Sequence, residues 1–299
     1  MVSKVLVAAM LGLWTVGPAS GVPLSPAGDG HLTVPTFVDG KGPFPFILDT
    51  GAEASGIYQW LADHLRLRRK AGPGEVLSGM TGTTVAPIYT LASLAMGGHQ
   101  LRNLSADSYP NRHDNGRQAG VLGDDFMDGV IAVFDYPCRR VEIHTKPVHL
   151  NALVAGALTP VELHRAGDTV LVSLPVRLNG VLGVALLDTG NRLTKISSSF
   201  ARAAGIDDHS SKFKDAAAIF GANSRPMIPR EGSIGTVRFG NVMIKDAHAQ
   251  IIDLPVMAQI FGDRPVMWLG ADLLEAERVI YDHAKNHVWF QASTCLSAR

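Results

Sequence analysis

The residues best suited to do chemistry in this sequence are two aspartates that occupy the same short motif. Asp49 opens an Asp-Thr-Gly triplet after an apolar stretch, and Asp188 opens a second triplet after another. One such triplet is a weak signal, because any aspartate that ends a strand before a glycine turn produces it. Two copies suggest a paired site, in which two neighbouring carboxylates cannot both ionise cheaply. One then keeps a proton while the other acts as a general base on a bound water molecule.

The segments before the two triplets repeat one another and predict the strands that position them. They read LTVPTFVDGKGPFPFILDTGA and LVSLPVRLNGVLGVALLDTGN. The pairs Asp39-Gly40 and Asn179-Gly180 favour tight hairpin turns, because Asp, Asn and Gly tolerate positive φ. Alternating apolar residues on either side predict half-buried strands. Each hairpin should therefore deliver its Asp-Thr-Gly from the end of a buried strand.

A second repeated motif, two apolar residues followed by glycine, lies downstream of each Asp-Thr-Gly triplet. The apolar-apolar-Gly sequence at residues 121–123 follows the first triplet, and residues 268–270 follow the second. The separation of matched residues grows from 139 at the triplets to 147 at these glycines, which indicates a duplicated lobe. We expect an N-terminal lobe over residues 21–155 and a C-terminal lobe over residues 156–299. Both should be mostly antiparallel β, with few convincing helical stretches: residues 58–70 and 200–204 and the short segments that begin near Asp125 and Asp272.

This arrangement resembles the retropepsin-like and pepsin-like aspartic proteases, and in particular bacterial single-chain proteins with duplicated lobes. The resemblance covers nearly all of the chain after residue 20. It implies an all-β fold of two pseudo-symmetric β-barrel lobes with few short helices and a central cleft. It also implies that Asp49 and Asp188 form a catalytic dyad that hydrolyses peptide bonds without a covalent intermediate. The residues that would support the dyad are Thr50, Gly51 and Ala52 in the first loop and Thr189, Gly190 and Asn191 in the second.

By the same resemblance, each supporting residue type has an expected role. The threonines would hydrogen-bond across the lobe interface, and the glycines would let the backbone turn tightly toward the carboxylates. Asn191 departs from the family pattern, which has Ala, Ser or Thr at this place. The sequence does not say which aspartate holds the proton, because that is a property of the coupled pair. A catalytically silent, bilobal peptide-binding protein is the alternative, since fold does not guarantee chemistry.

Two glycine-containing segments, each about 30 residues after a triplet, are candidates for a flap over the cleft. The first contains Ser78, Gly79 and Met80, and the second contains Gly221. Paired flaps would resemble a retroviral dimer, whereas a single flap would resemble pepsin. For each segment an ordinary surface hairpin is the alternative interpretation.

The composition is that of a globular protein. The chain has 299 residues, with 27 basic and 27 acidic side chains and 46% hydrophobic residues. Balanced charge argues against binding to nucleic acid or to an anionic membrane surface. Residues 1–20 combine one lysine, an apolar run and small residues, the pattern of a signal peptide, and the run is too short for a membrane anchor. We expect an exported monomer, periplasmic or secreted, whose partner is a polypeptide substrate.

The remaining polar residues have structural interpretations. Asp125 and Asp272 favour helix N-caps. His283 and His287 lack a metal-binding motif, and no nucleotide or phosphate motif occurs, so neither a metal nor a cofactor is expected. Cys138 and Cys295 either form a disulfide, for which loop entropy predicts about 4–5 kcal/mol, or remain unpaired. The sequence leaves both possibilities open.

Overall fold

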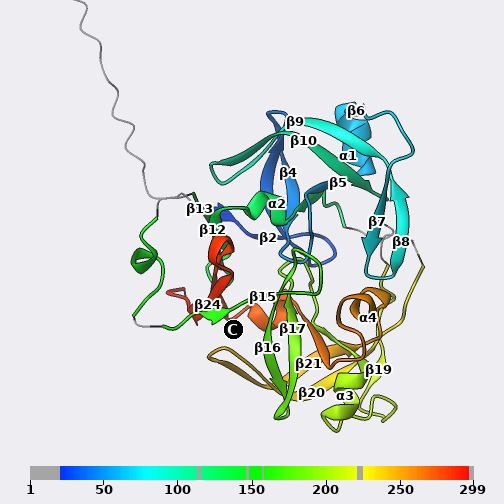
Figure 1. Cartoon of the computed structure of the whole chain (residues 1–299), viewed down its shortest axis with the longest axis vertical. Coiled ribbons are helices and arrows are strands. Elements are labelled where there is room, and N and C mark those ends of the chain that lie inside the picture. The colour runs from blue at the N-terminus through cyan, green and yellow to red at the C-terminus, as the bar shows by residue number, and fades with distance from the viewer. Residues whose placement is uncertain (1–20, 113–115, 146–147, 157, 221–224, 296–299) are drawn as a thin grey trace, which may run out of the picture.

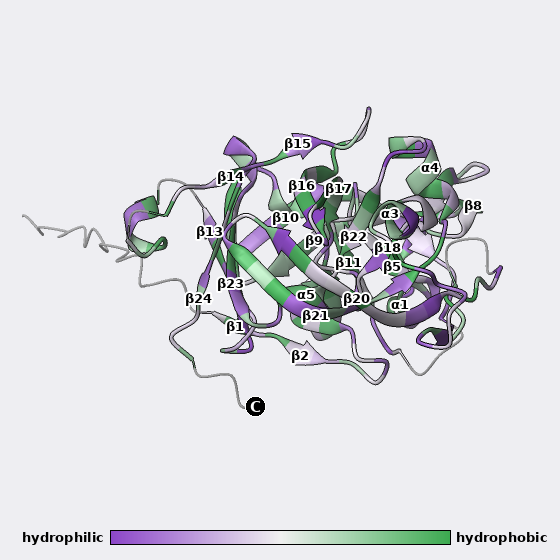
Figure 2. Cartoon of the chain, turned by 90° about the horizontal axis from the view of Figure 1, so that it is seen from below, coloured by the Kyte–Doolittle hydropathy of each residue, from purple (hydrophilic) through white to green (hydrophobic). Residues whose placement is uncertain are grey.

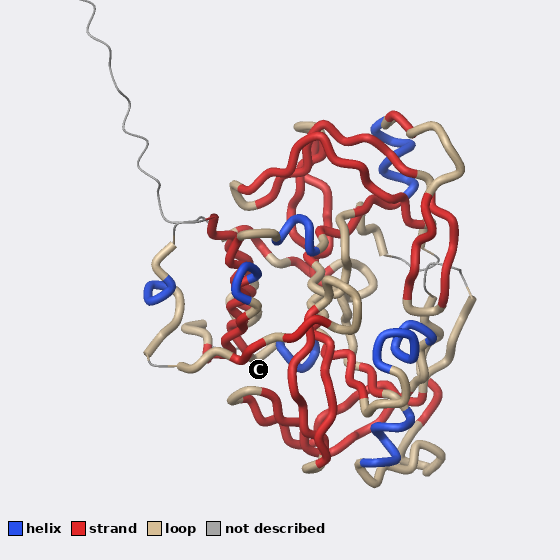
Figure 3. Tube along the Cα trace, in the orientation of Figure 1, coloured by secondary structure: helices blue, strands red, loops and turns tan. Residues whose placement is uncertain are grey.

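The computed structural model of the chain describes residues 21–299, apart from 113–115, 146–147, 157, 221–224 and 296–299. The predicted signal peptide and Gly221 of the second flap candidate lie outside the described residues. Figure 1 shows two lobes, one above the other, joined along one side by strands from both. Strands dominate both lobes and the helices are short (Figure 3), so the predicted all-β class is confirmed.

Each lobe is built on a closed barrel of six strands, and the two barrels share one strand order. The strands of the N-terminal barrel, in order, are β3 (Leu32–Val38), β4 (Lys41–Leu48), β11 (Gly120–Leu122), β5 (Gly56–Tyr58), β10 (His99–Tyr109) and β9 (Ile88–Met96). This barrel closes because β9 also pairs with β3. The C-terminal barrel closes in the same way; in order it contains β16 (Val172–Leu178), β17 (Val181–Leu187), β22 (Val266–Leu269), β18 (Lys195–Ile196), β21 (Val242–Ile251) and β20 (Arg230–Phe239). The duplication predicted from the sequence is therefore confirmed.

A third sheet of six strands joins the lobes. Its strands, in order, are β1 (Val22–Pro23), β13 (Arg140–Thr145), β12 (Val130–Asp135), β23 (Glu277–Asp282), β24 (His287–Ala292) and β14 (Val161–Glu162). At its centre β12 from the first half pairs antiparallel with β23 from the second. The lobes therefore share one continuous hydrogen-bonded sheet. The predicted lobe boundary near residue 155 falls in the connection between β13 and β14.

The remaining elements extend or cover this framework. Short edge strands are β2 (Ser25–Pro26), β6 (Arg68–Arg69), β15 (His164–Arg165) and β19 (Lys214–Asp215), and a separate hairpin is formed by β7 (Glu75–Gly79) and β8 (Gly82–Ala86). The helices are α1 (Gln59–Leu65), α2 (Asp124–Met127), α3 (Ser198–Ala203), α4 (Pro255–Phe261), α5 (Ala271–Leu274) and the 3₁₀ turns η1 (Leu150–Ala152) and η2 (His283–Lys285).

The two predicted hairpins are confirmed, and their turn residues adopt the expected backbone. Asp39 and Gly40 have φ of 51° and 73° between β3 and β4. Asn179 and Gly180 have φ of 50° and 90° between β16 and β17. Positive φ at both central residues matches the twist of the flanking strands, which is why these residue pairs select the turn.

The helix predicted over residues 58–70 was wrong in its second half. Helix α1 ends at Leu65 because Arg66 takes the left-handed conformation, with φ 54°, and its N–H bonds back to Ala62 and Asp63. Residues 68–69 then form β6, which pairs with β9. The basic run that follows Leu65 is thus an exposed turn and edge strand, not the end of a helix.

The hydrophobic core runs through both barrels. The largest cluster of buried apolar side chains includes Phe46 and Leu122 in the first lobe and Leu187 and Phe239 in the second. Figure 2 shows hydrophobic colouring over β16, α4 and α5. Among the described residues, no helix is both long and apolar enough to cross a membrane.

A disulfide ties the C-terminal end of the described chain to the first half. Cys138, in the turn between β12 and β13, is bonded to Cys295, beyond β24. Of the two possibilities that the sequence left open, the structure has the paired one. The bond closes a loop of 157 residues across the shared sheet.

We expect the double substitution Cys138→Ser/Cys295→Ser to lower the free energy of unfolding by about 2–4 kcal/mol, because the unfolded chain gains the entropy of an open loop. Urea unfolding of the oxidised protein and of the variant measures this. Addition of a reductant should destabilise the wild type to the level of the variant and leave the variant unchanged. Equal stability of the two proteins without reductant would contradict the expectation.

Candidate active site

The two predicted aspartates meet where the barrels face each other. Asp49 follows the last residue of β4, and Asp188 follows the last residue of β17. In each lobe a parallel strand supports the loop: the Asp49 N–H donates to the Leu122 carbonyl (2.9 Å), and the Asp188 N–H donates to the Leu269 carbonyl (3.1 Å). The apolar-apolar-Gly motifs are these supporting strands, β11 and β22. Their recurrence in the sequence thus reflects a repeated way of holding an Asp loop.

Reciprocal hydrogen bonds between two threonines lock the loops together. Thr50 Oγ1 donates to the Leu187 carbonyl and Thr189 Oγ1 donates to the Leu48 carbonyl, both at 2.7 Å. Each hydroxyl also accepts the backbone N–H of the other threonine, at 3.1 Å in both directions. Both threonines are buried. The four bonds cross the lobe interface, so the threonines hold the aspartates in a fixed mutual position.

The two glycines lie directly against the carboxylate of the opposite lobe. A Cβ atom at Gly51 would lie 2.5 Å from Asp188 Cγ, and one at Gly190 would lie 2.2 Å from Asp49 Cγ. Real Cβ atoms do not approach so closely, so any other residue would push the carboxyls apart. Each glycine is needed for space at the dyad.

We expect Gly190→Ala to destabilise the protein by about 1–3 kcal/mol, the usual cost of overpacking a tight site, and to displace Asp49. Gly205→Ala is the matched control, because nothing lies within 4 Å of its Cβ position and only its φ of 73° opposes the change. Urea unfolding of both variants measures the difference. The expectation fails if Gly190→Ala is as stable as the wild type, and Gly205→Ala shows how much of any loss a strained backbone alone can cause.

The electrostatics of the pair are those of two carboxyls that share one proton. Burial raises the pKa of Asp49 well above its ordinary value of 3.8, and the charge of Asp188 and a hydrogen bond between the two side chains raise it further. Hydrogen bonds from the backbone N–H groups of Gly51 and Gly190 lower the pKa of Asp49 and partly offset this rise. At mildly acidic pH the site can therefore hold one protonated and one charged carboxyl, the state required of a combined acid and base.

Asp188 has donors of its own. The Asn191 N–H donates to Asp188 Oδ1 (2.8 Å), and the indole N–H of Trp268 donates to Oδ2. Lys195 lies behind this loop, where its ammonium donates to Asn191 Oδ1 (2.5 Å) and to the Leu193 carbonyl (2.9 Å). Burial lowers the pKa of Lys195 to about 8. Asn191, which departs from the family pattern, thus accepts from a buried lysine.

The predicted N-cap role of Asp125 and Asp272 was wrong. The N-cap residues of α2 and α5 are glycines, and each aspartate lies inside the first turn of its helix. There its Oδ1 accepts the N–H of the next residue, Phe126 (2.9 Å) or Leu273 (3.0 Å). Asp125 Oδ1 also accepts from the N–H (2.7 Å) and hydroxyl (2.6 Å) of Ser55. Asp272 Oδ1 accepts the same two groups of Thr194, at 2.9 and 2.7 Å. Each carboxylate therefore holds the chain just after the Asp-Thr-Gly loop of its lobe.

Ser55 and Thr194 were missed in the sequence, although they are related by the same repeat as the aspartates. Their hydroxyls also accept the backbone N–H of Gly123 (3.1 Å) and Gly270 (3.0 Å) respectively. Each lobe thus links its Asp loop to its supporting strand through one hydroxyl. A hydroxyl residue six positions after each Asp was the signal that could have revealed them.

The first flap candidate is a hairpin that reaches toward the other lobe. Strands β7 and β8 pair so that Ser78 lies opposite Thr83 and Gly79 opposite Gly82, with Met80 in the turn. In Figure 1 this hairpin runs from the upper lobe down toward α4 of the lower lobe. Met80 packs against an apolar cluster of the C-terminal lobe that contains Trp268, the residue bonded to Asp188. In the second candidate, the described residues that flank the segment form one isolated bridge, between residues 219 and 227.

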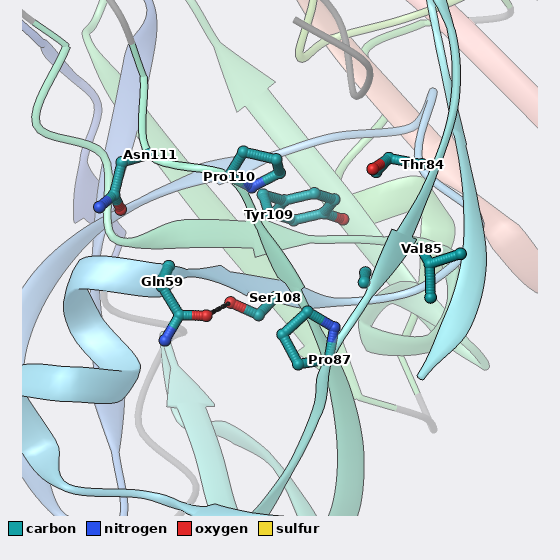
Figure 4. A pocket seen from close by; sticks show the side chains of 9 residues that line it. Gln59, Thr84, Val85, Pro87, Ser108, Tyr109, Pro110 and Asn111 are labelled. Atoms are coloured by element: carbon teal, nitrogen blue, oxygen red, sulfur yellow. Dashed lines mark hydrogen bonds between the residues drawn. The ribbon is translucent and has the colours of Figure 1, made fainter. Parts of the chain in front are cut away.

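A small open pocket lies at the base of the hairpin (Figure 4). It is lined by Gln59, Thr84, Val85, Ala86, Pro87, Ser108, Tyr109, Pro110 and Asn111. The Ser108 hydroxyl donates to Gln59 Oε1 (2.9 Å). Burial raises the pKa of Tyr109, and the charge of Asp49 adds to the effect. Tyr109 lines the pocket and is also close enough to Asp49 to interact with its charge.

The histidines near the C-terminus have protein partners. His283 Nε2 bonds to Asp124 Oδ1 (2.9 Å) and its Nδ1 accepts the Gly129 N–H (3.4 Å). The ring of His287 lies edge-on to that of Trp289. Within the part of the chain that the structure describes, no group of three or more His, Cys, Asp or Glu side chains is placed to hold a metal ion.

Comparison with protein families gives one result that agrees with this geometry. The family model described as aspartyl protease matches residues 34–126 and again residues 174–273. Each match contains one Asp-Thr-Gly loop and its supporting strand. A search of curated proteins found no match. The two matches together span more than half of the chain, which therefore belongs to the aspartyl protease family.

Proposed function

We propose that this protein is an exported aspartic endopeptidase in which Asp49 and Asp188 activate a water molecule between them. The observation that carries the proposal is the pairing of the two carboxyls, one from each lobe, by reciprocal threonine bonds. A protein that had lost its chemistry would not need both glycines in contact with the opposite carboxyl. Both halves of the site retain these features.

The proposed reaction is general acid–base hydrolysis. The charged carboxylate takes a proton from the water, whose oxygen attacks the carbonyl carbon of the scissile peptide bond. The protonated carboxyl donates to the carbonyl oxygen and stabilises the tetrahedral intermediate. The carboxyl that took the proton from water then passes it to the amide nitrogen, and the C–N bond breaks. A hydroxyl of the intermediate returns a proton to the other carboxylate, so both carboxyls regain their starting state. No covalent bond forms between enzyme and substrate.

An extended polypeptide is the substrate class that the surroundings favour. The hairpin with Met80 at its tip crosses from one lobe toward the apolar cluster of the other. A segment held under it would have main-chain groups available to the hairpin strands and side chains against apolar residues. The pocket at the hairpin base offers Gln59, Ser108 and Asn111 as polar groups for one residue of such a segment. The proposed enzyme acts as a monomer, because one chain supplies both carboxyls.

Two features support export. Residues 1–20 have the pattern of a signal peptide. The disulfide between Cys138 and Cys295 is of a kind that persists in oxidising compartments and is rare in the reducing cytosol. The periplasm or the extracellular medium is therefore the proposed location.

Incubation of the purified chain with an unfolded protein at acidic pH, with and without a statine-type inhibitor, tests the proposal. The expected result is internal fragments, identified by mass spectrometry, whose formation the inhibitor blocks. Products trimmed only from chain ends would contradict endopeptidase action. Tight inhibitor binding without any turnover would instead identify a catalytically silent peptide-binding protein.

A further inference from the structure

The two halves of the dyad share a sequence motif but differ in the residues beside it. In the C-terminal lobe, β18 and β22 place Lys195 opposite Trp268. At the corresponding register in the N-terminal lobe, β5 and β11 place Gly56 opposite Val121. A cationic and an aromatic side chain in one lobe thus replace a glycine and a valine in the other. Barrel packing does not require such residues, because Gly56 and Val121 complete the equivalent position.

In the C-terminal lobe, Trp268 contacts Asp188 directly and Lys195 contacts Asn191, which itself bonds to Asp188. The Trp268 indole N–H donates to Asp188 Oδ2, while Oδ1 accepts the N–H of Asn191 (2.8 Å). The Asn191 amide donates to the Trp268 carbonyl (3.4 Å) and accepts from the Lys195 ammonium (2.5 Å). These three side chains therefore form one network around Asp188. Asp49 has no equivalent among the hydrogen bonds of the described residues: its donors in the protein backbone are Gly51 and Gly190.

Both Trp268 and Lys195 are almost fully buried, each 4% exposed. An indole N–H can only donate, so its bond to a carboxyl oxygen favours the charged form of the acceptor. Lys195 keeps its ammonium charged through the acidic and neutral range, because burial lowers its pKa only to about 8. Both residues therefore favour a negative charge on Asp188.

Among the residues that the structure describes, four other charged or titratable groups lie near Asp188 and Lys195. Asp49 at the end of β4 and Tyr136 after β12 interact with Asp188, and Asp272 of α5 and Arg192 of the loop act on Lys195. Asp49 and Asp272 are acidic and Arg192 is basic, whereas Tyr136 stays neutral because burial raises its pKa. Among these groups Lys195 is the buried cation that interacts with Asp188.

We infer that Trp268 and Lys195 are positioning residues that make the dyad asymmetric, so that Asp188 is the charged base and Asp49 carries the shared proton. The inference rests on the proposed peptidase function for its catalytic meaning, and it assigns the two roles that the symmetric motif leaves open. Water is deprotonated by Asp188, and the carbonyl oxygen receives its hydrogen bond from Asp49.

The pH dependence of kcat/KM in Trp268→Phe and Lys195→Met tests this assignment. Loss of a hydrogen bond to the charged carboxylate, or of the nearby cation, should move the acidic limb to higher pH by about one unit. Trp60→Phe is the matched control, because it also removes an indole N–H bond, the 2.9 Å bond to the Gln118 carbonyl. A fall in activity at all pH values with an unmoved acidic limb would overturn the inference, since a merely structural role gives that result.

Indole ¹H–¹⁵N NMR of the full chain tests the same assignment without requiring activity. The sequence has four tryptophans, so the Trp268 resonance is assigned as the one missing in Trp268→Phe. Of the two proton steps of the coupled pair, the resonance should follow the lower one in the wild type, and it should lose this titration in Asp188→Asn. A resonance that is insensitive to pH, or that titrates unchanged in Asp188→Asn, would overturn the inference.

The two experiments separate failure of the inference from failure of the proposed function. If no peptide is cleaved but the Trp268 resonance titrates with Asp188, the assignment of charge stands and the peptidase proposal falls. If peptides are cleaved but the resonance does not titrate, the peptidase proposal stands and the asymmetry falls.

Discussion

Replacement of Asp49 or Asp188 by asparagine is expected to abolish peptide hydrolysis while the fold remains intact. Asparagine has nearly the shape of aspartate but neither accepts a proton from water nor donates one from a carboxyl. Loss of general acid–base catalysis should lower kcat by about 10³-fold or more. Asp168→Asn is the matched control, because Asp168 is an exposed carboxylate outside the site. Initial rates of peptide cleavage measure the effect, and near-wild-type activity in either dyad variant would exclude the proposed mechanism.

The Asp49→Asn variant should also show how much the raised pKa of Asp49 lowers stability near neutral pH. Because the pKa of Asp49 in the folded protein is raised above 3.8, its contribution to stability is full below about pH 4, where the carboxyl is protonated in both states. That contribution is lost as the pH rises toward the raised value. Asp49→Asn should therefore be more stable than the wild type near neutral pH, and the difference should shrink as the pH falls toward about 4. Thermal unfolding at several pH values measures this, and a constant difference would contradict the raised pKa.

Substitution of valine for Thr50 or Thr189 should have the largest effect on stability. Thr50→Val removes one hydroxyl and leaves the Leu187 carbonyl and the Thr189 N–H without their partners at the lobe interface. Each unsatisfied buried group costs about 1–3 kcal/mol, so each single variant should lose about 2–6 kcal/mol. Activity should fall as well, since the two Asp loops lose their register. Urea unfolding and cleavage rates measure the two effects.

Thr50→Ser is the control for this prediction. Serine keeps the hydroxyl and loses only a methyl group, so most of the stability and activity should remain. If the valine and serine variants are equally stable, the threonine bonds do not hold the lobes together and the account of the interface is wrong.

The sequence predicted the parts of the structure that are local or repeated. The Asp39-Gly40 and Asn179-Gly180 turns follow from residue types that accept positive φ, and the strands after them follow from apolar runs. The duplication was visible because the Asp-Thr-Gly loops and their supporting strands recur in order. The placement of Asp49 beside Asp188 then follows from the shared fold of the two lobes.

Features that depend on distant contacts could not be predicted in this way. The pairing of β12 with β23 joins residues far apart in sequence, and neither strand alone specifies its partner. Helix α1 ends early because Arg66 adopts a left-handed backbone, which its residue type does not favour. Asp125 was assigned to a helix N-cap from its neighbours, but its carboxylate also accepts hydrogen bonds from a serine 70 positions away. The strand pairing and the Ser55–Asp125 bonds join residues far apart in the sequence, so no local pattern specifies them.

The asymmetry of the dyad has the same origin. Lys195 appears in the sequence as one of many basic residues, and Trp268 as the first position of an apolar-apolar-Gly motif. Only the register of β18 on β22 brings them together beside Asp188. Lys195 and Trp268 differ from their counterparts in the other half, so the repeat in the sequence does not single them out.

The most direct test of the paired carboxyls is the pH dependence of kcat/KM measured beside the affinity for a statine-type inhibitor. If the two aspartates share one proton, both quantities should follow the same bell-shaped curve, because substrate and inhibitor need the singly protonated pair. The alkaline limb should lie above the ordinary range of a carboxyl, since the pKa of Asp49 is raised. Cleavage that the inhibitor does not block, or an affinity that does not change with pH, would contradict the account.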